Sequence, residues 1–509
     1  MADNTSNNKR IAKNTLMLYI RMIFVLCVSL YTSRVLLRAL GVVDYGLYNI
    51  VGGIVTMMGF FNGAVVSSTQ RFFSYSIGQR DSDNLNSVFS TILTIQIALA
   101  VLIFIIAETL GLWFIHTQLN IPADRFDAAV WVYQCALFSF LFSLVAVPFS
   151  ALLITHEDMD TYAFISISDV LLKLFIIFML PYLSYDKLKS YALLLLGVSI
   201  AITFIYLVFC RIKYPSIRFN KPKDKALFRT LFSYMGWNLW GNSAVVIMNQ
   251  GVNILLNIFF GPAVNAARAI SYQVNSAINQ LTVNFQMAMN PQIVKSYAQN
   301  DLDYMHKLVI TGAKFSFFMI LTLSFPVIVG TDVILGLWLG DVPKHAVLFT
   351  QLVLVLGSID SVSGPLMTAA QATGKIKKYQ TVVGILLILN LPISYVALLF
   401  GAIPEATVFV SIAISIIALF ARVRIICPQI GLGKRLFLSE AVTPVLKIGI
   451  PVFLFISGTV HCLKSPNNYI ILLLCVVSVM AMVTGFYFWG LNQRERVLLS
   501  QVTKKFIKK

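Results

Sequence analysis

The chain has 509 residues, of which 58% are hydrophobic and 12% are charged, and its mean hydropathy is +0.81. This composition excludes a soluble globular protein, which is about half apolar and about one quarter charged. It also excludes a disordered chain, which lacks apolar residues. The formal net charge of +18 fits nucleic acid, anionic lipid, an anionic substrate or membrane topology, and the positions of the charges decide among these.

About fourteen apolar segments are long enough to cross a bilayer, which takes about 20 residues. We therefore expect an all-α, multi-pass membrane protein. The expected helices span residues 14–37, 46–70, 87–113, 128–154, 161–182, 190–210, 230–260, 264–291, 307–330, 346–371, 379–401, 405–426, 442–460 and 469–490. The expected parts are a six-helix lobe over 1–210, a basic cytoplasmic linker over 211–229, a second six-helix lobe over 230–426, and helices 13 and 14 with a basic cytoplasmic tail over 427–509.

Basic residues gather on alternate links between these helices. With the amino terminus inside, 29 of the 39 Lys and Arg residues lie on cytoplasmic segments and 8 on outer loops. Arg21 and Lys173 lie within the membrane. Basic loops stay cytoplasmic, so we expect both termini to be cytoplasmic. Most of the net charge is thus an orientation signal, and nucleic acid is not an expected partner.

The two halves of the chain share short motifs at an offset of 217 to 225 residues. The matches are Q-x-D-x-D at 79–83 and 299–303, L-G-L-W at 110–113 and 335–338, and Pro148 and Tyr162 with Pro365 and Tyr379. They predict a six-helix unit used twice with the same orientation, as in transporters that work by alternating access. Pro148 and Pro365 are hinge candidates, with ordinary tolerated prolines as the alternative.

Polar side chains follow one face of the seventh and of the eighth expected helix. The stripes are Asn238, Asn242, Asn249 and Asn253, and then Asn265, Arg268, Tyr272, Asn275, Asn279, Gln286 and Asn290. Amides that faced lipid would lack hydrogen-bond partners, so they face other helices or a hydrated cavity. We favour a cavity whose amides bind sugar hydroxyls, with interhelical hydrogen bonds as the alternative. The candidate substrate contacts are Asn238, Asn242, Asn249, Asn275 and Asn279.

Four arginines at or within the membrane are candidates for binding phosphate, which arginine grips through paired hydrogen bonds. Arg21, Arg34 and Arg38 lie on the first expected helix and Arg268 opens the eighth. Anchoring to lipid head groups is the alternative for each of them.

Three other ionisable residues lie deep in apolar helices. Asp169 and Lys173 are one turn apart on the fifth expected helix, and Asp360 lies in the tenth. They are candidates for ion coupling, for a purely structural ion pair, or for contact with substrate.

Other chemistry finds no support in the sequence. The chain has no H-E-x-x-H, no complete phosphate-binding loop and no C-x-x-C, so we expect no metal site, no cofactor and no ATPase. The six cysteines are expected to be small buried hydrophobic residues.

The duplicated six-helix lobes with two further helices resemble the polysaccharide-transporter branch of the multidrug/oligosaccharidyl-lipid/polysaccharide exporter superfamily. The stretch SRVLLRALGVVDYGLYNIVGGIV at 33–55 resembles the R-x-L-G and Y-G pattern of Wzx-type flippases, and NILLNIFFGPAVNAARAI at 253–270 is also typical of that group.

This resemblance implies two lobes in a V around a central cavity that opens alternately inward and outward. The implied cargo is an undecaprenyl-pyrophosphate-linked oligosaccharide, flipped across the bacterial inner membrane for surface polysaccharide synthesis. In the related lipid II flippases the cavity is cationic, and the last two helices, here about 442–490, hold the lipid tail. The implied partners are the lipid-linked glycan, membrane lipid and other polysaccharide-assembly proteins.

Three other functions stay open. A cation-coupled drug or metabolite exporter of the same superfamily usually places a carboxylate early in the first lobe, whereas the first helix here carries Arg21 and no acid. A membrane polymerase or ligase of the same pathway needs a sizeable outer loop, and the outer loops are short. A structural scaffold explains neither the duplication nor the polar stripes.

Overall fold

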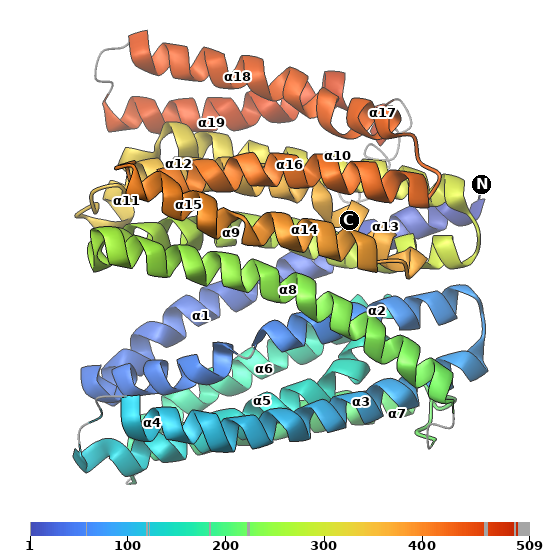
Figure 1. The fold of residues 1–509 in the computed structure, drawn as a ribbon, viewed down its shortest axis with the longest axis vertical. Coiled ribbons are helices and arrows are strands. Elements are labelled where there is room, and N and C mark those ends of the chain that lie inside the picture. Colours follow the sequence, from blue (N-terminus) through green and yellow to red (C-terminus); the bar gives the residue numbers. More distant parts are fainter. Residues whose placement is uncertain are drawn as a thin grey trace. The chain divides into compact units, whose positions relative to one another are not determined.

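The structure is a computed structural model that describes residues 2–57, 59–118, 121, 123–182, 185–220, 224–462, 467–492 and 495–496. Within these ranges every regular element is helical (Figure 1). The chain forms two compact units. The N-terminal unit is Arg10–Asn242, and the C-terminal unit is Ser243–Lys509 with Met1–Lys9. The division falls inside one long helix, α8, Lys225–Phe260.

The other helices follow the expected spans. Those before α8 are α1 Ala2–Met57, α2 Gly59–Gly78, α3 Ser82–Ile106, α4 Leu112–Gln118, α5 Phe126–Thr155, α6 Met159–Met179 and α7 Lys187–Lys213. Those after it are α9 Pro262–Ala298, α10 Leu302–Val329, α11 Thr331–Leu339, α12 Ala346–Ser361, α13 Ser363–Thr373, α14 Lys377–Ile388, α15 Asn390–Leu399, α16 Ala406–Gln429, α17 Lys434–Phe437, α18 Thr443–Cys462 and α19 Asn468–Gly485.

Twelve helical segments of the described chain are long and apolar enough to cross a membrane. Two expected spans are not among them. The span 46–70 is divided between the end of α1 and α2, and the span 264–291 lies on the polar helix α9. These two account for the difference from the fourteen expected, and the all-α membrane fold predicted by the sequence is confirmed.

The repeated Q-x-D-x-D motif forms the same turn in each unit. Asp81 accepts a hydrogen bond from the backbone N–H of Asn84 and caps α3, and Asp301 accepts one from Tyr304 and caps α10. The residue before each aspartate has positive φ, 57° at Arg80 and 59° at Asn300. An aspartate that accepts from the third residue of a helix is a favoured N-cap, so the motif marks where the second and third helices of each repeat meet.

Helix α1 bends at Gly41, where φ is 80° and ψ is 170°. Glycine suits this position because the positive φ is strained for residues with a Cβ atom. Beyond the bend, Asp44 accepts hydrogen bonds from Arg125 at the start of α5, and Arg125 Nη1 lies 2.6 Å from Oδ2 of Asp186, the N-cap of α7. One arginine thus fixes the second part of α1 to two other helices.

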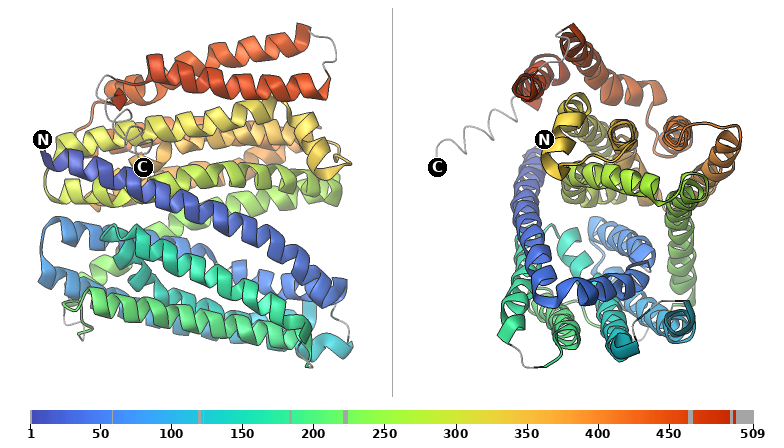
Figure 2. Two further views of the ribbon diagram at one scale, coloured as in Figure 1. Left: turned by 180° about the vertical axis from the view of Figure 1, so that it is seen from behind. Right: turned by 90° about the vertical axis from the view of Figure 1, so that its left-hand side faces the viewer.

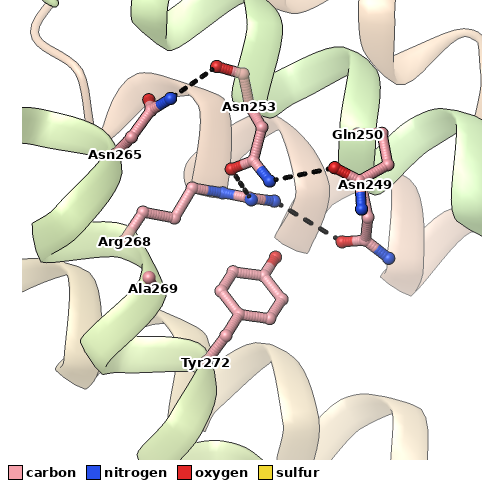
Figure 3. Close-up of a pocket in the computed structure, with 7 residues that line it drawn as sticks. All are labelled: Asn249, Gln250, Asn253, Asn265, Arg268, Ala269 and Tyr272. Carbon is pink, nitrogen blue, oxygen red and sulfur yellow. Dashed lines mark hydrogen bonds between the residues drawn. The ribbon is translucent and has the colours of Figure 1, made fainter. Parts of the chain in front are cut away.

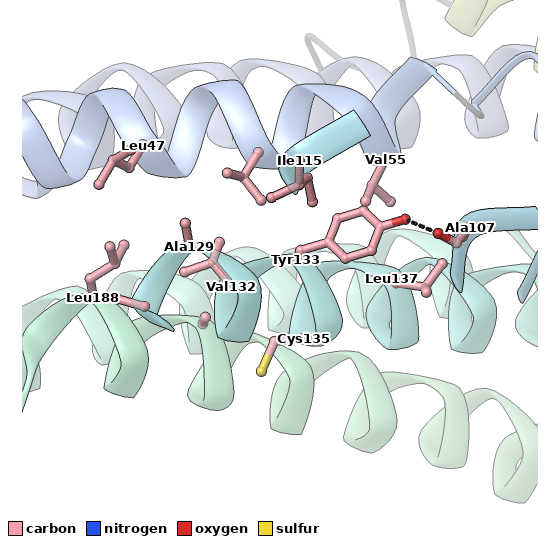
Figure 4. Packing of buried hydrophobic residues seen from close by; sticks show 13 residues of the cluster. Leu47, Val55, Ala107, Ile115, Ala129, Val132, Tyr133, Cys135, Leu137 and Leu188 are labelled. Carbon is pink, nitrogen blue, oxygen red and sulfur yellow. Dashed lines mark hydrogen bonds between the residues drawn. The ribbon is translucent and has the colours of Figure 1, made fainter. Parts of the chain in front are cut away.

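The core of the N-terminal unit surrounds the fully buried Tyr133 of α5 (Figure 4). Leu47 and Val55 of α1 pack against this core together with Leu188 of α7. The Tyr133 hydroxyl donates to the carbonyl of Ala107 at 2.8 Å, at the start of a π-helical turn that ends at Gly111. The Ala107 carbonyl also accepts the backbone N–H of Leu112, five residues further on, so the tyrosine hydroxyl adds a second hydrogen bond at the start of this π-helical turn.

In the C-terminal unit α18 and α19 pack side by side, and both pack against α10 (Figure 2). Lys314 of α10 is 3% exposed, and its Nζ lies 2.7 Å from Oε2 of Glu495, just beyond α19. This buried ion pair fixes the end of the C-terminal helix pair to the rest of the unit.

Four of the cysteines occupy buried positions, as the sequence predicts. They are Cys135, Cys210, Cys427 and Cys475. Cys27 on α1 differs, because its side chain is exposed.

Candidate functional site

Helices α8 and α9 form a hairpin whose polar faces line an open pocket of about 420 Å³ (Figure 3). Gly261 joins the helices with φ of 80°, and Pro262 begins α9 at the position where a missing N–H costs no helical hydrogen bond. The hairpin brings the C-terminal part of one amide stripe against the N-terminal part of the other. The pocket is lined by Asn249, Gln250, Asn253, Asn265, Arg268, Ala269 and Tyr272.

Arg268 is the charged residue of this pocket and is 5% exposed. Its Nη1 donates to Oδ1 of Asn253, and its Nη2 lies 3.4 Å from Oδ1 of Asn249. Its Cζ lies 4.3 Å from the ring centroid of Tyr272. Amide oxygens and an aromatic face orient a guanidinium but leave its charge in place. Within the described chain Arg268 forms no ion pair, and its buried Nε has no hydrogen-bond partner.

Further amide side chains form hydrogen bonds with Asn253, which itself accepts from Arg268. Asn265 Nδ2 donates to the backbone carbonyl of Asn253 at 3.1 Å, which ties the two helices together. Asn253 Nδ2 donates to Oε1 of Gln250 at 3.3 Å. The side chain of Asn253 therefore presents its oxygen to Arg268 and its amide nitrogen to Gln250 (Figure 3).

An uncompensated cation buried among membrane helices is costly, so such a residue marks a functional site by default. The pocket therefore suits an anionic group, with amides beside it that both donate and accept hydrogen bonds. Of the residues expected to contact substrate, the structure brings Arg268 and Asn249 together here. Gln250 was not among the polar residues that the sequence singled out.

Asn238 and Asn242 belong to the N-terminal unit. Asn238 is 1% exposed and donates from Nδ2 to Oγ of Ser68 on α2 at 2.8 Å. Asn242 Nδ2 donates to the backbone carbonyl of Asn238 at 2.8 Å. The Asn238 hydrogen bond joins α8 to α2, as in the interhelical alternative that the sequence left open, whereas the Asn242 hydrogen bond stays within α8. Substrate contact by either residue stays a prediction.

Asn275 and Asn279 lie further along α9 and do not line the pocket. Asn275 packs closely against α12, because a Cβ atom built on Gly357 would lie 2.2 Å from its Oδ1. That Oδ1 atom is buried without a hydrogen-bond partner in the described chain. Asn279 is half-buried. Substrate contact by either residue stays a prediction.

The predicted arginines of the first helix all lie within the sequence range of the N-terminal unit. Arg21, in the N-terminal unit, donates from Nε to Oγ of Ser166 at 2.7 Å and lies over the ring of Tyr162. Arg34 and Arg38 lie on α1, but their side chains are outside the described residues. Their predicted contact with phosphate stays a prediction.

The predicted ionisable residues occupy different settings. Lys173 Nζ lies 2.8 Å from Oδ2 of Asp169 and forms a partly exposed ion pair within α6. Asp360 is exposed and accepts a hydrogen bond from Oγ of Ser415. Two further basic side chains, Lys314 and Arg422, are buried within the C-terminal unit.

The two hinge candidates differ in local structure. Helix α5 continues through Pro148, whereas helix α12 ends at Ser361, four residues before Pro365. A proline cannot donate to the carbonyl four residues earlier. The freed carbonyl of Ser361 lies 3.4 Å from Nε2 of Gln286 on α9, which donates to it. A hinge role for either proline stays a prediction.

Comparison with known proteins finds similarity in three-dimensional structure but no match in sequence. No protein-family model matches the chain, and no curated protein matches it. Solved structures of transporters do match. An outward-facing multidrug resistance MATE family transporter of the MOP superfamily gives a TM-score of 0.72 at 11% identity, over 84% of this chain and 96% of that chain.

Two further structures show the same similarity. A MATE protein in its bent conformation gives a TM-score of 0.71 at 12% identity, over 83% of this chain and 96% of that one. A MOP superfamily transporter from Pyrococcus furiosus, described as having a binding pocket of reverse polarity that suggests a different function, gives 0.68 at 12% identity, over 83% and 96%. The chain therefore has the fold of MATE transporters of the MOP superfamily, and it is a multi-pass membrane protein.

Proposed function

We propose that this protein is a flippase that moves a polyprenyl-pyrophosphate-linked oligosaccharide from the inner to the outer leaflet of the bacterial cytoplasmic membrane by alternating access. The product would serve surface polysaccharide synthesis. The observation that carries this proposal is Arg268, a buried guanidinium without a carboxylate partner in the described chain, set among amides in a pocket of about 420 Å³.

The chemistry of the pocket fits the two parts of such a head group. A guanidinium binds phosphate through short, charge-assisted hydrogen bonds. Amides such as Asn249 and Gln250 both donate and accept, as sugar hydroxyls do. A charged head group that crossed about 30 Å of hydrocarbon unaided would lose its hydration at prohibitive cost. A polar pocket replaces that hydration while the lipid tail stays in the bilayer.

The charge of the pocket argues against a cationic drug as cargo. A cation beside Arg268 would meet a like charge, and none of the described residues that line the pocket carries a carboxylate. The Pyrococcus furiosus transporter, which is similar in fold, is likewise described as having a binding pocket of reverse polarity. A cation-coupled exporter of drugs or metabolites is the alternative function.

Topology and tail binding complete the proposal. The proposed topology has both termini in the cytoplasm, which the distribution of basic segments favours by the positive-inside rule. Helices α18 and α19 expose large apolar side chains such as Leu454, Phe455 and Leu473, which suit contact with lipid tails. Membrane lipid and other polysaccharide-assembly proteins are the proposed partners.

The test is to replace Arg268 in cells that depend on this protein for surface glycan. Lipid-linked glycan is labelled metabolically, and its leaflet is determined by periodate oxidation of intact spheroplasts, because periodate does not cross the membrane. Arg268→Gln should leave the glycan protected at the inner face and reduce surface polysaccharide at least tenfold. Arg268→Lys, which keeps the charge but loses the planar fork, should give an intermediate result.

Lys344→Gln is the matched control, because it removes one positive charge from an exposed residue outside the pocket. It should behave as the wild type. Wild-type surface glycan with Arg268→Gln present at normal abundance would exclude Arg268 from the transport path. Resistance to cationic drugs that depends on Asp169 or Asp360 would favour the drug exporter instead.

A further inference from the structure

The segment that joins α7 to α8 in the N-terminal unit carries a strong positive charge. Residues 211–229 hold seven Lys and Arg residues and one acidic residue. The structure describes five of these basic residues, and all five are exposed: Arg211, Lys213, Arg218, Lys225 and Arg229. Among the ion pairs of the described chain, one involves this group, and it joins Lys213 Nζ to Oδ1 of Asp158 at 3.0 Å. Four positive charges are thus left for a partner outside the chain.

Hydrogen bonds fix this segment to α3 through its backbone. The N–H of Arg218 donates to Oδ1 of Asn86 at 2.8 Å, and the N–H of Asn220 donates to Oγ of Ser90 at 3.0 Å. The Ser90 hydroxyl lies 3.4 Å from the carbonyl of Arg218 and donates to it. The backbone is held in place, whereas the guanidinium of Arg218 is left exposed.

Helix α8 begins with basic residues at an end that favours acidic ones. Lys225 is its first residue, Arg229 follows about one turn later, and no acidic residue lies in the first turn. The free N–H groups of a helix N-terminus carry partial positive charge, so Lys and Arg are unfavourable there. Asp224 accepts hydrogen bonds from the N–H groups of Ala226 and Leu227 and offsets one of these charges. The remaining positive charge favours an anion bound from outside.

Exposed aromatic rings accompany the basic side chains. Phe219 is 52% exposed, Phe228 is 40% exposed and Phe232 is 62% exposed. The rings of Phe228 and Phe232 stack, with 6.1 Å between their centroids. Basic side chains beside exposed apolar ones are typical of surfaces that lie in the head-group region of a bilayer. An anionic lipid offers phosphate to the basic groups and acyl chain to the rings.

The position of the segment suits lipid head groups. It joins two helices that are each long and apolar enough to cross a membrane. Helix α8 has 36 residues and is therefore about 54 Å long, whereas the hydrocarbon core is about 30 Å thick. Its ends can therefore reach the head-group region, where phosphate is the main anion.

We propose that the surface formed by Arg211, Arg218, Lys225 and Arg229 with Phe219 and Phe228 is a binding site for anionic phospholipid. The lipid phosphate neutralises the start of α8 and the segment before it, and fixes the junction of α7 and α8 at the membrane surface. Zwitterionic lipid is a poor substitute, because its own cationic group opposes the four basic side chains. The inference concerns the lipid around the transporter and does not depend on the proposed cargo.

The test uses the full-length protein in phosphatidylethanolamine vesicles that contain a small fraction of phosphatidylglycerol with a photoreactive group near its head group. After illumination, lipid adducts are located by mass spectrometry of peptic peptides. Wild type should carry at least tenfold more adducts over residues 211–232 than with photoreactive phosphatidylcholine. Arg218→Gln/Lys225→Gln/Arg229→Gln should lose most of this enrichment, because each basic side chain near an anionic surface contributes about a fivefold factor.

Lys375→Gln/Lys377→Gln/Lys378→Gln is the matched control, because it removes the same charge from three exposed residues of the C-terminal unit. It should keep the wild-type enrichment over 211–232. Inorganic phosphate, compared with sodium chloride at matched ionic strength, should not compete with the lipid. Competition by phosphate would overturn the proposal in favour of a site for the free anion.

Equal adduct yields from the two photoreactive lipids in wild type would also overturn the proposal and leave the surface to a partner other than lipid. So would a folded triple variant at 218, 225 and 229 that keeps the wild-type enrichment. Folding is followed by gel filtration and thermal unfolding. If that variant does not fold, the comparison of the two lipids in wild type still decides whether the surface selects anionic lipid. The measurement needs no glycan, so its failure is distinct from failure of the proposed function.

Discussion

The guanidinium of Arg268 lies over the ring of Tyr272, with 4.3 Å between its Cζ and the ring centroid. The ring supports one face of a cation whose edges are held by Asn253 and Asn249. A cation–π contact of this kind contributes about 2 kcal/mol where water is excluded.

Replacing Tyr272 should therefore weaken anion binding without removing the charge. Tyr272→Leu should raise the dissociation constant for inorganic pyrophosphate by about 5- to 30-fold, the equivalent of about 1–2 kcal/mol. Tyr272→Phe keeps the ring and should stay within about threefold of wild type. Isothermal titration of the purified protein measures both. Equal affinity in Tyr272→Leu and wild type would show that the ring does not position Arg268.

Asn253→Asp changes the charge of the pocket while preserving its shape. The new carboxylate would accept the hydrogen bond from Arg268 as a charged partner and neutralise it. We expect pyrophosphate affinity to fall at least tenfold while the unfolding temperature stays equal or rises. Asn257→Asp, the same change one turn along α8 at an exposed residue outside the pocket, is the control. A comparable loss in both variants would attribute the effect to net charge alone.

The buried pair of Lys314 and Glu495 should respond strongly to removal of one partner. Glu495→Ala leaves the Lys314 ammonium, 3% exposed, without its carboxylate, and should lower the free energy of unfolding by about 3–5 kcal/mol. Lys314→Met/Glu495→Ala should recover most of this loss, because neither charge is then buried alone. Thermal unfolding in detergent measures both variants. If the stability change of the double variant equalled the sum of the changes in the two single variants, the two residues would not interact.

The ion pairs of Arg125 should stabilise the protein less at acidic pH, because their carboxylates become protonated. The hydrogen bond to Asp44, helped by Asp186 and opposed by burial, raises the pKa of Arg125. Burial opposes ionisation of Asp186, but hydrogen bonds from the Lys189 N–H and Arg125 outweigh it and hold its pKa below its ordinary value. A carboxyl with a lowered folded pKa stabilises the protein above its unfolded pKa, about 4, and loses that stabilisation as pH falls toward the folded value.

Lowering the pH from 6 to 3 should therefore reduce the unfolding temperature of wild type more than that of Asp186→Asn. Asparagine remains a good N-cap for α7, so this variant isolates the charge. At neutral pH, Arg125→Gln should lower the free energy of unfolding by about 1.5–3 kcal/mol, the range for hydrogen bonds to charged groups. An identical pH dependence in wild type and Asp186→Asn would exclude Asp186 as the titrating group.

The helices were predictable from the sequence because lipid imposes length and apolarity on each span. The repeat was predictable for a local reason, since Asp81 and Asp301 cap their helices through the same turn. Helix α9 shows the limit of the apolarity criterion. Its polar residues lie against α10, α12 and α13 or line the pocket. The helix is therefore explained by packing within the unit and not by its hydropathy.

The roles of the individual amides were not predictable. Asn238 and Asn249 share one face of α8, but α8 changes unit between Asn242 and Ser243, so the same face meets different neighbours. The buried cations show a similar limit. Lys314 is paired with a residue 181 positions away, and position along a helix says nothing about such a partner.

Cys27 on α1 is exposed, unlike the four buried cysteines. Among the cysteines whose side chains the structure describes, its thiol is the exposed one. Because it lies in an apolar span, a small, membrane-permeant maleimide should react with it in preference to Cys135, Cys210, Cys427 and Cys475. The native sequence thus carries its own attachment point for a spin label or fluorophore, ahead of the bend at Gly41, from which movement of the first helix could be followed.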